Sequence, residues 1–222
     1  MRTALLVGAT GLTGGHCLEA LLEDDRYEKV TILVRRTLPL THQKLEQQVV
    51  DFDDLDACAE TIQGTDLFCC LGTTIKKAGS KEAFCKVDLE YPRELARIAS
   101  ANGVENFLII SAMEAGEKSA LFYGRIKGQM EQAVSEYPFK GVYLFRPSLL
   151  MGEREKFRLA EGVGIKLLTA MPFLLVGSLK KLRPIKAEAV AAAMITAANS
   201  DSSGTHVYTS DQIQEIYDTG RV

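Results

Sequence analysis

The sequence predicts an α/β fold, a doubly wound parallel sheet with a small C-terminal lobe on its substrate side. Short apolar runs alternate with stretches of helical periodicity, and glycine-containing turns separate several of them. Strands that are apolar along their whole length are typical of parallel sheets covered by helices on both faces. The chain has 222 residues, of which 46% are hydrophobic and 25% charged, so we expect residues 1–222 to form one domain.

The predicted elements follow one another without a linker or an internal repeat. Strands are expected at Thr3–Val7, Val30–Val34, Gln48–Val50, Leu67–Leu71, Phe107–Ile110 and Val142–Phe145. Helices are expected between them at Leu12–Leu22, Leu55–Ile62, Lys81–Ala101 and Ser119–Ser135. The strands follow from their short apolar runs, and the helices from apolar residues that recur at helical spacing.

The pattern changes after Pro147. A helical stretch at Glu153–Met171, an alanine-rich helix at Ala187–Ala198 and a strand at Thr205–Thr209 are expected there, followed by a polar end. This third of the chain contains too little apolar sequence for a core of its own. We therefore expect residues 148–222 to pack at one end of the sheet as a substrate-side lobe.

The composition argues against several classes of protein. With 26 basic and 29 acidic residues the net charge is −3, so no nucleic-acid partner is expected. The longest apolar stretch, Val163–Val176, is interrupted by Lys166 and Pro172, so no membrane partner is expected. Five cysteines without a Cys-x-x-Cys pair, and no amino-terminal signal, predict a cytoplasmic protein with reduced thiols. The three histidines are too scattered for a metal site.

A glycine-rich turn, Gly8–Gly14, connects the first strand to the first helix. Gly8 permits a tight turn, Gly11 lets backbone amides approach a ligand, and Gly14 lets the helix pack on the sheet. The amides and dipole of a helix N-terminus favour a pyrophosphate, so we interpret the turn as a nucleotide site rather than a connection without a ligand. Its G-x-x-G-x-x-G spacing differs from the common G-x-G-x-x-G fingerprint.

The residues after the second strand indicate which dinucleotide binds. An NAD site carries a carboxylate about 20 residues beyond the glycines, whereas this chain has Arg35 and Arg36. Guanidinium groups pair with a 2′-phosphate, so the pattern favours NADP(H); the alternative is a pair of solvated arginines at a strand end. Asp51 and Phe52 follow the third strand, in a place where they could meet the adenine ring.

Three residues form a candidate catalytic group. Ser111 ends the fifth strand, and Tyr123 and Lys127 lie four residues apart in the next helix. A lone Tyr-x-x-x-Lys pair arises easily by chance, but this one follows a strand whose carboxyl end shares an edge of the sheet with the glycine turn. Tyr123 would exchange a proton with the substrate oxygen, Lys127 would lower the pKa of Tyr123, and Ser111 would hold that oxygen. The alternative is a core tyrosine, a surface lysine and a strand-end serine without a shared function.

The chain resembles the short-chain dehydrogenase/reductase superfamily, specifically the Tat-interactive protein (HTATIP2-like) family of its atypical branch. The resemblance is carried by Gly8–Gly14, Cys70–Thr74, Lys77-Ala78-Gly79, Val87-Asp88, Ser111, Tyr123–Gly128 and Phe145-Arg146-Pro147. It covers residues 1 to about 150 and is thinner beyond them.

The resemblance implies a Rossmann-like domain that binds NADP. It places Thr10, Gly11, Leu12 and Thr13 on the pyrophosphate, and Arg35 and Arg36 on the 2′-phosphate. Leu71, Gly72 and Thr73 would lie beside the adenosine and ribose. Pro147, Ser148 and Leu149 would lie against the nicotinamide, and Lys127 would bind the nicotinamide ribose. One departure concerns Asp88, because extended members of the superfamily often have asparagine there. An aspartate cannot donate an amide hydrogen bond to a proton relay.

Two functions stay open on the sequence. The first is an NADP(H)-dependent oxidoreductase that reduces a small carbonyl compound or oxidises an alcohol, with Ser111, Tyr123 and Lys127 as its catalytic residues. The second is an NADPH-binding regulatory or redox-sensing protein without robust turnover. A sugar-nucleotide epimerase is a weaker third reading, because the C-terminal lobe is short for such a substrate. A homodimer is left open, and no segment is assigned to its interface.

Overall fold

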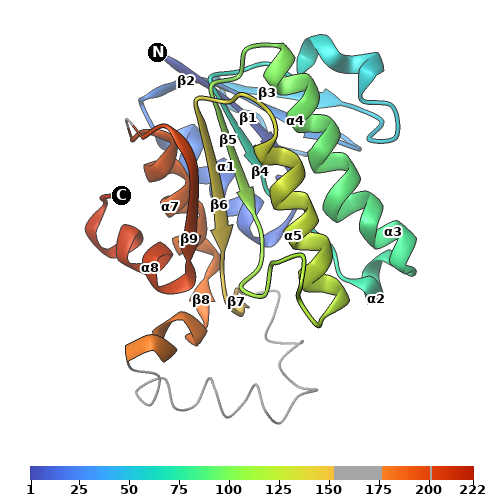
Figure 1. Cartoon of the computed structure of the whole chain (residues 1–222). Coiled ribbons are helices and arrows are strands. Elements are labelled where there is room, and N and C mark those ends of the chain that lie inside the picture. Colours follow the sequence, from blue (N-terminus) through green and yellow to red (C-terminus); the bar gives the residue numbers. More distant parts are fainter. Residues whose placement is uncertain (153–176, 201) are drawn as a thin grey trace.

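A seven-stranded parallel sheet runs through the molecule in the order β3-β2-β1-β4-β5-β6-β9 (Figure 1). The computed structural model describes residues 1–152, 177–200 and 202–222. The strands are β1 (Arg2–Val7), β2 (Tyr27–Val34), β3 (Leu45–Val49), β4 (Asp66–Cys69), β5 (Asn106–Ile110), β6 (Gly141–Arg146) and β9 (Gly204–Thr209). The strand order reverses between β1 and β4, so the predicted doubly wound, Rossmann-like sheet is confirmed.

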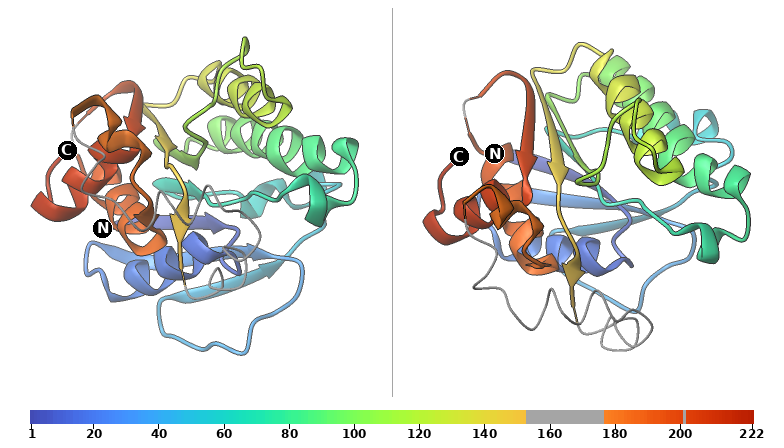
Figure 2. Two further views of the ribbon diagram at one scale, coloured as in Figure 1. Left: turned by 90° about the horizontal axis from the view of Figure 1, so that it is seen from below. Right: turned by 60° about the horizontal axis from the view of Figure 1, so that its bottom comes forward.

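Helices cover both faces of the sheet (Figure 2). One face carries α1 (Leu12–Glu23), α7 (Ala187–Ala198) and α8 (Ser210–Thr219), and the other carries α4 (Tyr91–Ala101) and α5 (Phe122–Ser135). Along β1 the side chains alternate between the two layers: Ala4 and Leu6 join the first apolar cluster, and Leu5 and Val7 join the second. This two-sided burial explains why the strands are apolar along their whole length.

Three differences from the predicted elements have physical causes. The third strand lies at Leu45–Val49, earlier than expected, because this edge strand is only half-buried and its sequence is mostly polar. The helix at Lys81–Ala101 is interrupted by a π-helical turn at Lys86–Glu90, between α3 (Lys81–Cys85) and α4. The polar end contains α8, which begins with a capping box between Thr209 and Gln212.

Smaller elements complete the described part of the chain. They are a 3-10 helix at Asp56–Thr61 in place of the expected α-helix, α2 (Ile75–Ala78), the paired strands β7 (Leu150–Met151) and β8 (Ile185–Lys186), and a 3-10 helix at Gly177–Leu182. The predicted helix at Glu153–Met171 lies outside the described residues. None of the helices in the described ranges has the length and apolar content to cross a membrane.

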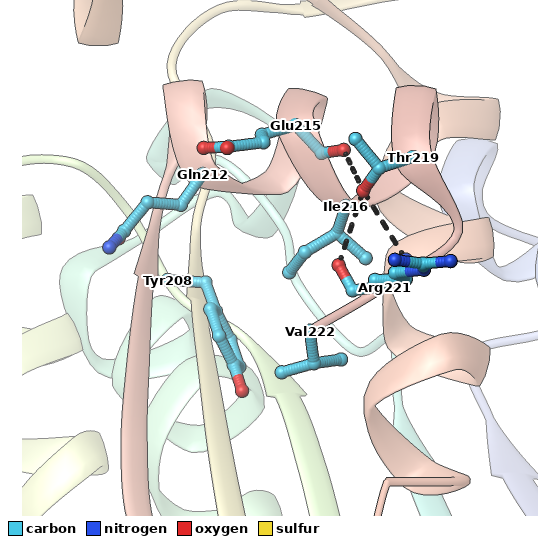
Figure 3. A pocket seen from close by; sticks show the side chains of 7 residues that line it. All are labelled: Tyr208, Gln212, Glu215, Ile216, Thr219, Arg221 and Val222. Atoms are coloured by element: carbon cyan, nitrogen blue, oxygen red, sulfur yellow. Dashed lines mark hydrogen bonds between the residues drawn. The ribbon is translucent and has the colours of Figure 1, made fainter.

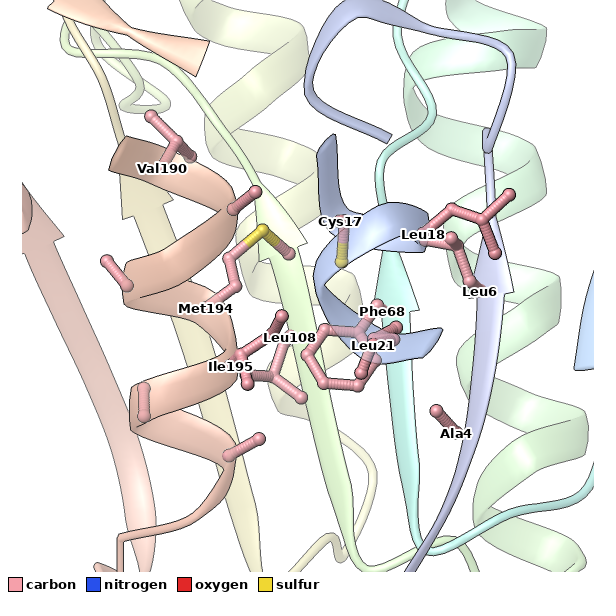
Figure 4. Packing of buried hydrophobic residues seen from close by; sticks show 14 of the residues in the cluster. Ala4, Leu6, Cys17, Leu18, Leu21, Phe68, Leu108, Val190, Met194 and Ile195 are labelled. Atoms are coloured by element: carbon pink, nitrogen blue, oxygen red, sulfur yellow. The ribbon is translucent and has the colours of Figure 1, made fainter. Parts of the chain in front are cut away.

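The C-terminal third contributes to the sheet as well as to the lobe. Strand β9 pairs with β6, and α7 packs against α1 (Figure 4). The alanines of α7 are small enough to let the two helices lie close together, and most of them are buried. This close packing occurs within one chain, and a homodimer stays a prediction.

A buried carboxylate joins four strands at the amino end of the sheet. Asp66 of β4 is fully buried and accepts hydrogen bonds from Arg2 Nε at 2.7 Å, Tyr27 Oη at 2.8 Å and Asn106 Nδ2 at 2.8 Å. The Tyr27 hydroxyl in turn accepts a bond from Asn199 Nδ2 at 3.2 Å. These bonds hold together the edge of the sheet that lies opposite the glycine turn.

We expect Asp66→Asn to lower the free energy of unfolding by about 3 kcal/mol, because an amide cannot accept from all three donors and no longer balances the Arg2 charge. Urea unfolding measures the change. The matched control is Glu46→Gln, which removes one carboxylate from an exposed pair with Lys29 and should cost less than about 1 kcal/mol. Equal effects of the two substitutions would contradict the prediction.

Candidate functional site

The glycine turn between β1 and α1 is packed too tightly for side chains at two positions. Gly8 has a φ of +88°, and a Cβ there would lie 2.6 Å from the Cys70 carbonyl oxygen. A Cβ on Gly14 would lie 2.1 Å from the Gly8 carbonyl oxygen. The turn closes on itself, since the Gly11 N–H donates to that same Gly8 oxygen at 2.9 Å. Glycines at these positions therefore bring α1 directly against the end of β1.

The N-terminus of α1 has the properties of an anion site. The helix begins at Leu12 with Gly11 as its N-cap, which forms no side-chain capping bond, and no acidic residue occupies the first turn. The first-turn amides and the positive end of the helix dipole thus face no carboxylate from their own helix. Thr10 and Gly11 are exposed, and Thr13 is buried. This turn fits the pyrophosphate that the sequence predicted for it.

The arginines predicted to select NADP lie at the carboxyl end of β2. Arg35 and Arg36 are exposed, and neither forms an ion pair with a carboxylate in the described part of the chain. The ends of β2 and β3 lie side by side, since Val34 pairs with Val49, and this places Asp51 and Phe52 near the arginines.

An aromatic pair follows β3 at the same edge of the sheet. The Phe52 ring lies 5.5 Å from the Tyr91 ring, measured between centroids. The Tyr91 hydroxyl donates to Asp53, whose carboxylate also pairs with Lys86 at 2.8 Å. The Asp51 carboxylate accepts a hydrogen bond from the Asp53 backbone N–H at 2.9 Å, which is a contact within the turn after β3.

The candidate catalytic residues meet at the carboxyl end of β5. Ser111 and Lys127 are each 3% exposed, and the Lys127 ammonium donates to the Ile110 carbonyl oxygen at 3.3 Å. Tyr123 lies one helical turn before Lys127 on α5, with its ring 5.7 Å from the ring of Phe84. The Ser111 hydroxyl has no hydrogen-bond partner within the described residues. A buried hydroxyl without a partner costs about 1–3 kcal/mol, which makes Ser111 a candidate for bonding a ligand.

The sequence did not identify Asp88 as a member of this group. Asp88 is 1% exposed; its Oδ1 lies 2.8 Å from Lys127 Nζ, and its Oδ2 accepts the Thr73 amide at 2.9 Å. It lies on the π-helical turn Lys86–Glu90. The available signal was its family position, where extended members of the superfamily often have asparagine. Its partner, however, lies 39 residues away in the sequence, since 127 − 88 = 39.

The environment of Tyr123 adds an effect of burial that the sequence did not reveal. Burial raises the pKa of Tyr123 above that of an ordinary tyrosine, and the attraction of Lys127 offsets only part of the shift, while Asp88 and Glu114 raise the pKa further. For Lys127, burial opposes the charge, but Asp88 and Tyr123 outweigh it and raise the pKa of the ammonium. Lys127 thus acts in the predicted direction, but burial outweighs it and the pKa of Tyr123 rises overall. In this protein Tyr123 is a protonated phenol at neutral pH.

The predicted nicotinamide segment follows β6, next to Ser111. Ser111 donates its backbone N–H to the Phe145 carbonyl oxygen at 2.6 Å, which joins the ends of β5 and β6. Pro147 is buried, while Ser148 and Leu149 are half-buried. The Ser148 hydroxyl donates to the Arg183 carbonyl and lies 3.0 Å from the Ser210 hydroxyl, so this segment is tied to the C-terminal third. The segment Leu71–Thr73 follows β4 and meets Asp88 through Thr73.

A separate hollow of about 530 Å³ lies beside β9 and α8, away from these residues (Figure 3). Its walls come from the C-terminal end of the described chain: Tyr208, Gln212, Glu215, Ile216, Thr219, Arg221 and Val222. None of the candidate site residues is among those that line it.

Comparisons with known proteins identify the family of the chain. A family model described as NAD(P)H-binding matches residues 8–140. Protein HTATIP2 of Rattus norvegicus is 35% identical over 175 residues, which cover 77% of this chain and 72% of that protein. Protein FMP52-1, mitochondrial, of Scheffersomyces stipitis is 30% identical over an alignment of 224 residues, covering 97% of this chain and 98% of that protein. A short-chain dehydrogenase/reductase superfamily structure from Agrobacterium tumefaciens with bound NAD has a TM-score of 0.67 at 17% identity, covering 93% of this chain and 77% of that one.

The predicted cytoplasmic location is wrong by the same comparison. FMP52 proteins from several organisms, Debaryomyces hansenii and Candida glabrata among them, are named mitochondrial. The prediction rested largely on cysteines expected to be reduced. Reduced thiols indicate a reducing environment without identifying the compartment that provides it.

Proposed function

Because this chain belongs to the HTATIP2-like family of atypical short-chain dehydrogenases/reductases, we propose that it uses NADP(H) to reduce a small carbonyl compound to an alcohol. The observation that carries the proposal is the buried group at the end of β5, where Lys127 bonds to the strand and the Ser111 hydroxyl has no hydrogen-bond partner among the described residues. Reduction needs a proton donor, and the raised pKa of Tyr123 suits that role.

The residues that would hold the cofactor lie at the carboxyl ends of the strands, at the same edge of the sheet as this group. The amides of Gly8–Gly14 would bind the pyrophosphate, Arg35 and Arg36 the 2′-phosphate, and Pro147–Leu149 would lie against the nicotinamide. The tight packing of Gly8 and Gly14 supports the first assignment. The exposure of the two arginines, without carboxylate partners in the described chain, supports the second.

The chain's own residues supply the proton and the orientation. Bound NADPH supplies a hydride to the carbonyl carbon. Ser111 Oγ donates a hydrogen bond to the substrate oxygen and orients it. Tyr123 transfers its phenolic proton to that oxygen, which leaves an alcohol and a phenolate. The Lys127 ammonium stabilises the phenolate until a proton from solvent restores the phenol.

Two measurements test the proposal. Fluorescence titration should show tighter binding of NADPH than of NADH, and NADPH oxidation should be seen with at least one member of a panel of small aldehydes and ketones. Tight NADPH binding without turnover on the whole panel would support a regulatory or redox-sensing protein instead. Turnover only with nucleotide sugars would support an epimerase.

We expect Arg35→Ala to weaken NADPH binding by about tenfold to a hundredfold, because a guanidinium–phosphate bond contributes about 1.5–3 kcal/mol. NADH lacks the 2′-phosphate and should bind almost as well as before. Arg26→Ala is the matched control, since Arg26 is exposed at the other end of the sheet and pairs with Asp24. Equal losses for NADPH and NADH in Arg35→Ala would refute the 2′-phosphate assignment.

A further inference from the structure

The turn that carries Asp88 departs from an ordinary helix. In the segment Lys86–Glu90 the backbone is π-helical, and the Tyr91 N–H bonds to the Lys86 carbonyl oxygen. π-Helical turns inside longer helices are frequent at functional sites, because the extra residue changes where a side chain points. Here the turn buries a carboxylate beside Lys127.

Asp88 contacts two parts of the candidate site. One oxygen lies 2.8 Å from the Lys127 ammonium, and the other accepts the Thr73 amide at 2.9 Å. Thr73 belongs to the segment predicted to line the adenosine side, and Lys127 lies one turn from Tyr123. The Asp88 side chain thus holds the loop after β4, which is predicted to line the cofactor. It also pairs with the Lys127 ammonium, one helical turn from Tyr123.

The charged and titratable groups around this pair come from four elements. Lys127 faces Asp88 on the π-helical turn, Tyr123 on its own helix and the Cys69 thiol on β4. Tyr123 faces Lys127, Asp88, and Glu114 in the segment after β5. With Asp88 ionised and Lys127 protonated, the two charges cancel while Tyr123 keeps its proton.

We infer that Asp88 is a positioning residue that balances the Lys127 charge and thereby keeps Tyr123 in its proton-donating form up to alkaline pH. The inference rests on the proposed reductase function and assigns a role to a residue outside the Ser-Tyr-Lys group. Without the carboxylate, the Lys127–Tyr123 pair would carry a net positive charge. Such a pair loses its first proton more readily, whichever of the two side chains releases it.

The first test is the pH dependence of carbonyl reduction by the full chain. We expect Asp88→Asn to move the alkaline limb of the pH–rate profile down by about one pH unit or more, the usual size of the effect of one neighbouring charge. NADPH affinity should change little, because the asparagine oxygen can still accept the Thr73 amide. Glu90→Gln is the matched control: it removes one exposed carboxylate from the same turn and should leave the limb in place.

The second test needs no turnover. In an NMR titration of the wild-type protein with labelled lysine and tyrosine, Lys127 should keep its proton to a higher pH than the surface lysines. In Asp88→Asn the first proton should leave the Lys127–Tyr123 pair at a lower pH than in the wild type. If Asp88 had only a structural role, Asp88→Asn would lower the stability of the protein and leave the titrations of Lys127 and Tyr123 unchanged.

The two levels of the proposal fail in different ways. If the wild-type protein reduces none of the carbonyl compounds, the proposed function is wrong, while the NMR titration still decides the role of Asp88. The inference is overturned if wild type and Asp88→Asn have the same alkaline limb in the pH–rate profile. It is also overturned if Lys127 loses its proton at the same pH as the surface lysines or at a lower pH. Should Asp88→Asn fail to fold, the wild-type titration alone decides it.

Discussion

Replacing Tyr123 by phenylalanine should reduce turnover by about 10²- to 10⁴-fold, the usual contribution of a positioned proton donor. The substitution removes only the hydroxyl, so the ring can keep its contact with Phe84 5.7 Å away. Lys127 keeps its pair with Asp88, so the buried charges stay balanced. We therefore expect NADPH affinity and thermal stability close to those of the wild-type protein.

The measurement is kcat/KM for the best substrate of the carbonyl panel, beside a fluorescence titration with NADPH. Tyr217→Phe is the matched control, because it removes a hydroxyl that lies on the surface and bonds to Glu188. Its turnover should equal that of the wild type. If Tyr123→Phe retains wild-type turnover, the proton comes from another group and the proposed role of Tyr123 is lost.

Replacing Gly14 by alanine should abolish NADPH binding and destabilise the protein by about 3 kcal/mol. The new methyl carbon would lie 2.1 Å from the Gly8 carbonyl oxygen, which is backbone and has no side-chain rotation to relieve the contact. Either α1 moves away from β1 or the turn reopens, and both changes displace the amides that would bind the pyrophosphate.

The neighbouring residue provides the control for this prediction. A Cβ on Gly15 would meet only the Ala9 carbonyl oxygen at 3.8 Å, an ordinary contact. Gly15→Ala should therefore leave NADPH binding intact and stabilise the protein by about 0.5–1 kcal/mol, because alanine favours a helix interior more than glycine. Loss of binding in both variants would mean that α1 tolerates no change, and that the close approach at Gly14 has no special role.

The first part of the fold could be predicted because local rules and global packing agree there. Each glycine of Gly8–Gly14 has a spacing that a strand-to-helix turn requires, and the fully apolar strands identify a sheet covered on both faces. The same pattern could not identify the edge strand β3, which is half-buried and carries polar residues. Nor could it find α8, whose helix is short and mostly polar.

The site was predictable in position but not in its electrostatics. The order of strands and helices placed Ser111, Tyr123 and Lys127 at one edge of the sheet. The ion pair between Asp88 and Lys127 joins two helices distant in sequence, and a π-helical turn breaks the helical periodicity at Asp88. The direction of the Tyr123 pKa shift depends on burial and on that pair, so it required the structure.

The packing of α7 on α1 bears on the order in which the protein matures. The glycine turn at residues 8–14 is synthesised well before residues 187–198, which pack against the helix that follows the turn. During synthesis α1 lacks this partner for its apolar surface until residues 187–198 have emerged from the ribosome. A nascent chain should therefore acquire coenzyme affinity late and abruptly, long after the residues that contact the coenzyme have been made.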